Sequence, residues 1–160
     1  MIWRLRRTKS EYGALHLIIG GIHMLQVYSS LIDVAAGAAY PFNNTAIDKG
    51  CAENLSGPST IQLNQRGIYL VEVDGYATPD AATMVTAQLY VNGVAQPQAI
   101  SGFMGTAVTA TNNFGFKCFV RVTENNTSCN CYSSPTILQV INGTTAVSDA
   151  HINVCITKIC

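Results

Sequence analysis

The sequence predicts an all-β protein, an antiparallel sandwich or barrel. From Met24 onward, short strand-like runs are separated by Asn, Gly, Pro and Ser at intervals of about 8 to 12 residues. An Asn-Gly pair joins two of the runs, and no convincing amphipathic helix interrupts the series. With 160 residues, the chain is long enough to bury one core without help from disulfides or metal ions.

The clearest strand is expected over residues 67–77 (GIYLVEVDGYA). Successive side chains of a strand point to opposite faces, so Tyr69, Val71 and Val73 are expected to form a core strand. The opposite face mixes apolar and acidic side chains: Ile68, Leu70, Glu72, Asp74 and Tyr76. Such a mixture predicts a face that is only partly shielded from water.

The next strong signal is a hairpin within residues 83–97, where Asn92 and Gly93 supply the positive φ angles of a tight turn. Further strands are expected at 114–124, 136–143 and 151–159. In the first of these, one face is apolar: Phe114, Phe116, Cys118, Val120 and Val122. Linker-like stretches are expected at 33–44, 53–59 and 124–135.

Charge and hydropathy exclude two classes of partner. Only 11% of the residues are charged and the mean hydropathy is positive, so the apolar excess is expected inside the fold or between copies of the chain. No stretch approaches the roughly 18 apolar residues of a membrane-spanning helix, and no membrane partner is expected. Four basic groups face one acidic group in the first 23 residues, which leaves 5 basic and 8 acidic groups afterwards. The acidic body argues against nucleic acid.

Residues 1–23 differ in kind from the rest, with a basic start and a brief apolar patch. Three interpretations stay open. The segment could be a secretory signal, although its apolar patch is short and contains His16. It could also be a basic arm that docks on an acidic partner surface, or the result of a mis-annotated start. The last rests on residues 20–23, whose codons can spell a purine run before the codon of Met24. The domain is therefore expected to span residues 24–160.

Six cysteines are many for a cytosolic chain and few for a disulfide scaffold of this size. Buried free thiols, one or two disulfides and a zinc site are the alternatives. The candidates for disulfides are Cys118, Cys129, Cys131 and Cys155. No CxxC pair accompanies His151, the only histidine after Met24, so neither a metal nor a cofactor is expected.

Catalytic and nucleotide-binding motifs do not occur: GxSxG, P-loop, HExxH and EF-hand patterns are all missing. A catalytic triad could be composed of a serine, His151 and Asp149, but a triad is defined by its geometry and not by residue types alone. The simpler interpretation is that Asp149 is a turn residue and that His151 begins a strand. No enzymatic activity is expected. NxS/T triplets are expected to mark exposed turns; they begin at Asn43, Asn54, Asn125, Asn126 and Asn142.

Four segments carry a resemblance to a known family: YPFNNTAIDKGC (40–51), STIQLNQRGIYLVEVDG (59–75), QLYVNGVAQP (88–97) and INVCITKI (152–159). In this order they resemble the globular domain of collagen-like exosporium glycoproteins and small trimeric bacteriophage proteins. Both are similar to the tumour necrosis factor (TNF) and complement globular-head superfamily. The resemblance covers residues 24–160 and implies an antiparallel jelly-roll sandwich of the TNF-like type that forms a homotrimer.

The resemblance also implies that the strand at 67–77 turns one face to the core and the other to the threefold axis. The implied trimer interface comprises Leu70, Glu72, Asp74 and Tyr76. Three copies of Glu72 near an axis repel one another, so a proton, water, a cation or a basic residue such as Arg66 or Lys117 must compensate them. The alternative, that Glu72 faces solvent, stays open.

The function that the resemblance implies is structural, on the surface of a bacteriophage virion: a trimeric capsid decoration or head-fibre protein. Its partners would be its own copies and the major capsid protein or another virion protein, after synthesis in the bacterial cytoplasm. The missing collagen-like repeat favours this phage type over a spore-surface protein. A second alternative is an adhesion module that recognises host glycan through loops 78–83 and 104–113, where only Phe103 and Phe114 offer stacking surfaces.

Overall fold

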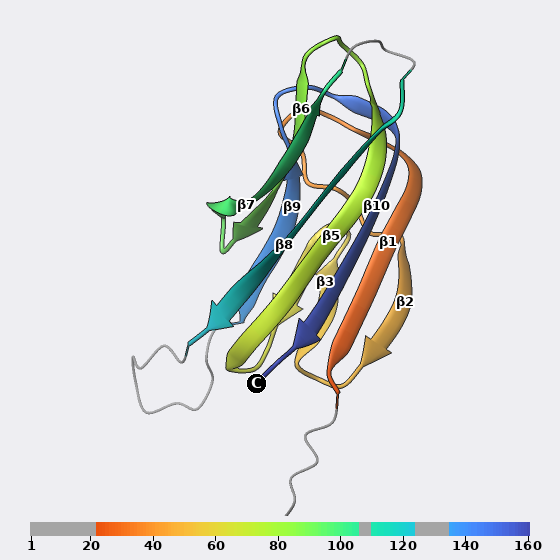
Figure 1. The fold of residues 1–160 in the computed structure, drawn as a ribbon. Coiled ribbons are helices and arrows are strands. Elements are labelled where there is room, and N and C mark those ends of the chain that lie inside the picture. The colour runs from red at the N-terminus through yellow and green to blue at the C-terminus, as the bar shows by residue number, and fades with distance from the viewer. Residues whose placement is uncertain (1–21, 106–109, 124–134) are drawn as a thin grey trace, which may run out of the picture.

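The computed structural model describes residues 22–105, 110–123 and 135–160, and ten strands make up its regular structure (Figure 1). The strands are β1 (Met24–Val34), β2 (Asn44–Lys49), β3 (Glu53–Gly57), β4 (Thr60–Leu63), β5 (Gly67–Pro79), β6 (Met84–Val91), β7 (Val94–Met104), β8 (Asn112–Val122), β9 (Thr136–Asn142) and β10 (Val147–Lys158). The described part contains no helix that could cross a membrane. Expectations for residues 1–21, Cys129, Cys131, Asn125 and Asn126 fall outside the described residues.

Two five-stranded antiparallel sheets form the layers of the fold (Figure 1). Sheet A has the order β2-β1-β10-β5-β8, and sheet B has the order β3-β4-β9-β6-β7. The first long strand, β1, pairs with the last, β10, and β10 pairs in turn with β5. Each sheet therefore joins segments that lie far apart in the sequence, as a jelly roll requires.

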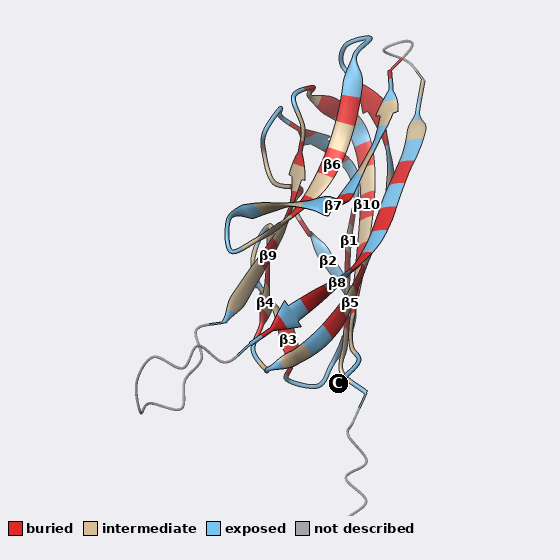
Figure 2. Cartoon of the chain, turned by 60° about the vertical axis from the view of Figure 1, so that its left-hand side comes forward, coloured by how far each residue is buried: buried red, intermediate tan, exposed pale blue. Residues whose placement is uncertain are grey.

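The core lies between the sheets and is filled mainly by alternate residues of β1, β4, β5, β6, β8, β9 and β10, which Figure 2 shows as buried bands along β8. In β5, Tyr69, Val71 and Val73 are buried. The apolar face predicted for β8 is buried as well: Phe114, Phe116, Cys118, Val120 and Val122. The core therefore rests on the period-two pattern that the sequence carries.

The β6–β7 hairpin turns at Asn92 (φ 51°) and Gly93 (φ 78°), both in the left-handed region. One expected linker is a strand instead, because residues 53–57 form β3, which pairs with β4. The prediction was wrong because Glu53, Asn54 and Ser56 lack the apolar alternation of a strand, and pairing with β4 decides the conformation.

Asn142 is buried at the end of β9 and does not mark an exposed turn. Its amide Nδ2 donates to three backbone carbonyls, those of Val34 (3.1 Å), Ala35 (3.1 Å) and Thr145 (2.9 Å). The hydroxyl of Tyr40 donates to its Oδ1 at 3.5 Å. The amide is tolerated in the core because these partners satisfy it, and it connects the end of β1 to the β9–β10 turn.

Candidate subunit interface

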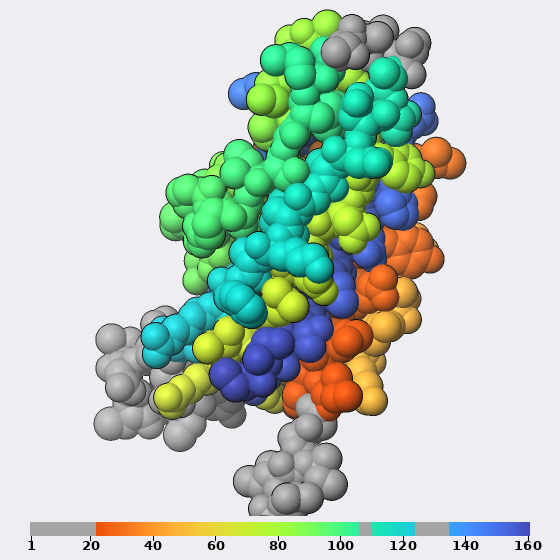
Figure 3. All heavy atoms as spheres, viewed as in Figure 1, coloured from red at the N-terminus to blue at the C-terminus, as the bar shows by residue number. Residues whose placement is uncertain are grey.

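The side of sheet A that faces away from sheet B is here named the open face. Among the described elements, none covers it, and β8, β5, β10 and β1 lie side by side across it in Figure 3. Antiparallel pairing sets the side chains of neighbouring strands in rows. One such row holds Cys155 of β10, Glu72 of β5 and Lys117 of β8.

An apolar patch occupies the end of the open face where β5 begins and β10 ends. It consists of Ile68, Leu70, Phe119 and Ile159. Leu70 pairs with Phe119 in the β5–β8 ladder, and the amide of Ile159 donates to the carbonyl of Ile68 at 2.7 Å. Phe119 is 68% exposed, which leaves most of an aromatic ring in water. The four side chains thus form a contiguous surface that gains free energy when another surface covers it.

Next to the apolar patch, Lys117 forms an ion pair with Glu72 across the β5–β8 ladder. The hydrogen bond and the negative charge of Glu72 raise the pKa of Lys117. Lys117 is therefore one of the two basic partners expected for Glu72. The pair lowers the net charge in the middle of the open face.

A shallow hollow of about 400 Å³ lies beyond this ion pair, because Gly115 presents no side chain beside Asp74. Its lining includes Glu72, Asp74, Gly115, Lys117, Asn153 and Cys155. Asn153 donates to Asp74 Oδ1 at 3.1 Å and accepts from Gln26 Nε2 at 3.0 Å. These bonds run across three strands and hold the polar side chains of the hollow in place.

The far end of the open face carries two stacked rings. The rings of Tyr76 and His151 lie 5.2 Å apart with an interplanar angle of 17°, and Ser30 Oγ lies 2.8 Å from His151 Nδ1. β-bulges in β1 and β10 shape this end, with positive φ angles at Leu31 (54°) and Asp149 (48°). Within the described part of the chain, His151 has no carboxylate hydrogen-bond partner. Asp149 therefore does not complete the triad considered from the sequence.

Comparison with solved structures identifies the architecture. Murine APRIL superposes with a TM-score of 0.65 at 10% sequence identity, and the match covers 86% of this chain and 99% of APRIL. Eiger TNF from S. frugiperda superposes with a TM-score of 0.65 at 12% sequence identity, and the match covers 88% of this chain and 94% of Eiger. The chain has a TNF-like jelly-roll fold. PRD1 vertex protein P5 is also similar, with a TM-score of 0.56 at 17% identity over 88% of this chain and 99% of its own. No family model matches the chain, and no curated protein matches its sequence.

The TNF-like fold separates the cysteines. Cys118 faces the core and Cys155 faces the opposite way, because they align with the consecutive residues Val71 and Glu72 of β5. Both are free thiols in the structure and, facing opposite ways, they do not pair with each other; the other two candidates, Cys129 and Cys131, lie outside the described residues. Burial raises the pKa of both thiols, and the charge of Glu72 adds to the effect at Cys155. No group of three or more His, Cys, Asp or Glu side chains among the described residues is arranged to hold a metal ion.

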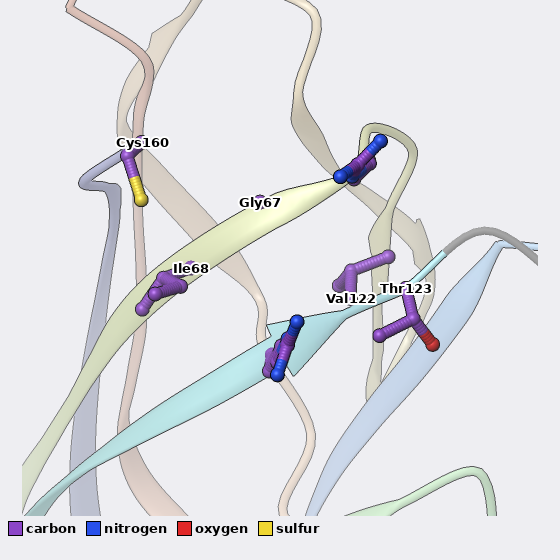
Figure 4. A pocket seen from close by; sticks show the side chains of 7 residues that line it. Gly67, Ile68, Val122, Thr123 and Cys160 are labelled. Atoms are coloured by element: carbon purple, nitrogen blue, oxygen red, sulfur yellow. The ribbon is translucent and has the colours of Figure 1, made fainter.

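An open pocket of about 630 Å³ lies beside the apolar patch (Figure 4). Its lining residues are Arg66, Gly67, Ile68, Arg121, Val122, Thr123 and Cys160. Gly67 permits the close approach of the chain, because a Cβ there would lie 2.1 Å from the carbonyl oxygen of Cys160. Arg66 and Arg121 bring two guanidinium groups to the lining of this pocket.

From the sequence, the β5 side of the open face and Lys117 of β8 were predicted, whereas Phe119 of β8 and the β10 side were not. Phe119 could have indicated an apolar contact on β8, because it lies between Lys117 and Arg121 on the polar face of that strand and is the one aromatic residue there. Ile159 gave no signal of its own. Only the pairing of β10 with β5 shows that it adjoins Ile68.

Proposed function

We propose that this chain is a non-enzymatic structural protein of a bacteriophage virion surface, a homotrimeric capsid decoration or head-fibre protein. The observation that carries the proposal is the exposed apolar patch on the open face of a TNF-like sandwich. Burying Phe119, Ile159 and Ile68 between copies removes apolar area from water at about 25 cal/mol per Å².

The rest of the open face supports contact between copies of the chain. Interfaces combine an apolar core with polar groups that find partners, and the Lys117–Glu72 pair provides such compensation. A closed ring of three copies brings two different surfaces of each copy together. Leu70 and Glu72 would lie in this contact, and Asp74 and Tyr76 at its far end.

The virion location is supported by a second line of reasoning. The sequence resembles small trimeric bacteriophage proteins, and a phage vertex protein shares the fold over 88% of this chain. Glycan recognition has less support, because Phe114 is buried and Phe103 packs against the core. Among the described residues of the loops, no exposed aromatic side chain is present for stacking on a sugar.

Light scattering after size exclusion tests the oligomer. We expect a mass near three times 17.1 kDa for the wild-type chain. Phe119→Glu, which places a charge in the apolar patch, should shift the mass toward that of the monomer. Val94→Glu is the matched control, because Val94 is 64% exposed on the β6–β7 hairpin, away from the open face. A monomeric wild type, or equal effects of both substitutions, would overturn the proposed trimer.

The virion assignment has a separate test. Virions produced from the genome that encodes this chain should contain it as a stoichiometric component by mass spectrometry. Immunogold electron microscopy should then place it on the particle surface. Purified particles without the protein would contradict the assignment even where the trimer is confirmed.

A further inference from the structure

A buried acid without partners lies at the end of the sandwich, apart from the open face. Glu53, the first residue of β3, is 2% exposed, and neither of its carboxyl oxygens has a hydrogen-bond partner. Buried polar groups are almost always hydrogen-bonded, and a buried charge without a partner is far more costly than a neutral acid. The protonated form of Glu53 therefore fits the observed arrangement.

The cation that acts on Glu53 is bonded elsewhere. Lys158 of β10 aligns with Tyr69, whose side chain points between the sheets. Its Nζ donates to Gln65 Oε1 at 2.8 Å, in the loop between β4 and β5. The positive charge of Lys158 nevertheless acts on Glu53 and lowers the pKa of the acid against the larger effect of burial. The Tyr69 hydroxyl contacts the carbonyls of Gln65 and of Ala52, the residue before Glu53, so the loop that holds Lys158 adjoins the start of β3.

Other groups around Glu53 are neutral or repulsive. Asp48 of β2 raises the pKa of Glu53, and Tyr69 of β5 is itself affected by the Glu53 charge. Tyr69 does not satisfy the acid, because its hydroxyl donates to the backbone carbonyl of Gln65 at 2.7 Å. Cys51, just before β3, accepts from Gln65 Nε2 at 3.1 Å. Of the groups that act on Glu53, Lys158 is the one that favours its carboxylate.

We propose that Glu53 and Gln65 compete for the ammonium group of Lys158, forming a pH-operated latch between the two sheets. When Glu53 loses its proton to solvent, Lys158 leaves the amide oxygen of Gln65 and pairs with the carboxylate. Pairing with the carboxylate adds the attraction between two opposite full charges, which the amide oxygen of Gln65 does not offer, and the flexible lysine stem permits the exchange. In the high-pH state, Lys158 links β10 of sheet A to β3 of sheet B.

All groups of the latch belong to a single chain. The latch adjoins the apolar patch, because Ile159 follows Lys158 directly. Gln65 reports the exchange, since its side chain bonds Lys158 through Oε1 and Cys51 through Nε2. Releasing Lys158 removes one of these two bonds and changes the electronic environment of the amide.

Nuclear magnetic resonance of the Gln65 side-chain amide tests the latch. The measurement uses a Cys51→Ser background, so that no thiol contacts the amide. A Gln65→Met variant assigns the signal, because the signal is lost in it. Between pH 5 and pH 9, the signal should move with a midpoint near pH 7. Glu53→Gln should abolish the movement and leave the signal at its low-pH position. Lys158→Met should abolish it as well, because no ammonium group is left to exchange.

Asp80→Asn is the matched control, because Asp80 is an exposed carboxylate directly after β5, at the opposite end of that strand from Gln65. Its Gln65 signal should titrate as in the parent. An unmoved Gln65 signal while the Glu53 carboxyl carbon titrates would overturn the latch, and so would an undiminished movement in Glu53→Gln. If Glu53→Gln fails to fold, the Lys158→Met series decides on its own, since a persisting movement there also refutes the exchange.

Discussion

Replacing Glu53 by glutamine should stabilise the folded protein at alkaline pH and change little at acidic pH. Desolvation raises the pKa of Glu53 from its ordinary value of 4.5 to about 7, with Lys158 opposing and Asp48 adding to the shift. The folded state therefore binds the Glu53 proton more tightly than the unfolded chain does. Wild-type stability falls as pH rises between these two values, because the unfolded state releases the proton first.

The size of the effect follows from the two pKa values. A difference of one pH unit corresponds to about 1.4 kcal/mol, so ionised Glu53 costs the fold about 3 kcal/mol above pH 8. Below pH 4.5 the acid is protonated in both states and this cost disappears. A glutamine side chain has nearly the same shape and never ionises. The free energy of unfolding of Glu53→Gln should therefore exceed that of the wild type by about 3 kcal/mol at pH 8.5, and by far less at pH 5.

Urea unfolding at pH 5 and pH 8.5 measures both values, at one fixed protomer concentration so that any oligomer contributes equally. Asp80→Asn serves as the control, because Asp80 is an exposed carboxylate outside the proposed subunit contact. A gap between wild type and Glu53→Gln that is the same at both pH values would refute the reasoning. A variant less stable than the wild type at pH 8.5 would also refute it, because pairing of the Glu53 carboxylate with Lys158 would then outweigh the cost of burying the charge.

Three further results are expected. Asn142→Ala should lower the free energy of unfolding by about 3 kcal/mol at any pH, measured by urea unfolding, since it removes three hydrogen bonds to backbone carbonyls. Leu31→Asn should raise the melting temperature by a few degrees, because leucine at φ 54° is strained, its side chain is 76% exposed, and asparagine tolerates this conformation. In the native protein, a maleimide should label Cys51 and Cys160 rapidly and Cys118 slowly, as peptide mass mapping will show.

The strand positions were largely predictable, because burial with a period of two is local information. Residues 67–77 and 136–143 nearly match β5 (Gly67–Pro79) and β9 (Thr136–Asn142). The last strand begins earlier than expected, at Val147, because a bulge interrupts its alternation near Asp149. A bulge inserts a residue into one strand only, so a strict two-residue period cannot continue through it.

Features that depend on pairing between distant segments were not predictable. Glu53 lies in a polar stretch that predicts a linker, and its burial follows from β3 joining the edge of sheet B. The apolar patch is similar, because Leu70 meets Phe119 only through the register of β5 with β8. The burial of Asn142 also depends on distant carbonyls near Val34.

The end of β10 relates the proposed subunit contact to the proposed latch. Lys158 and Ile159 are consecutive, so in an extended strand their side chains point to opposite sides of sheet A. Lys158 aligns with the buried Tyr69, while Ile159 belongs to the apolar patch. If the exchange of Lys158 shifts the end of β10, Ile159 shifts with it. If both proposals hold, the trimer dissociation constant should depend on pH near 7, and Glu53→Gln should remove that dependence.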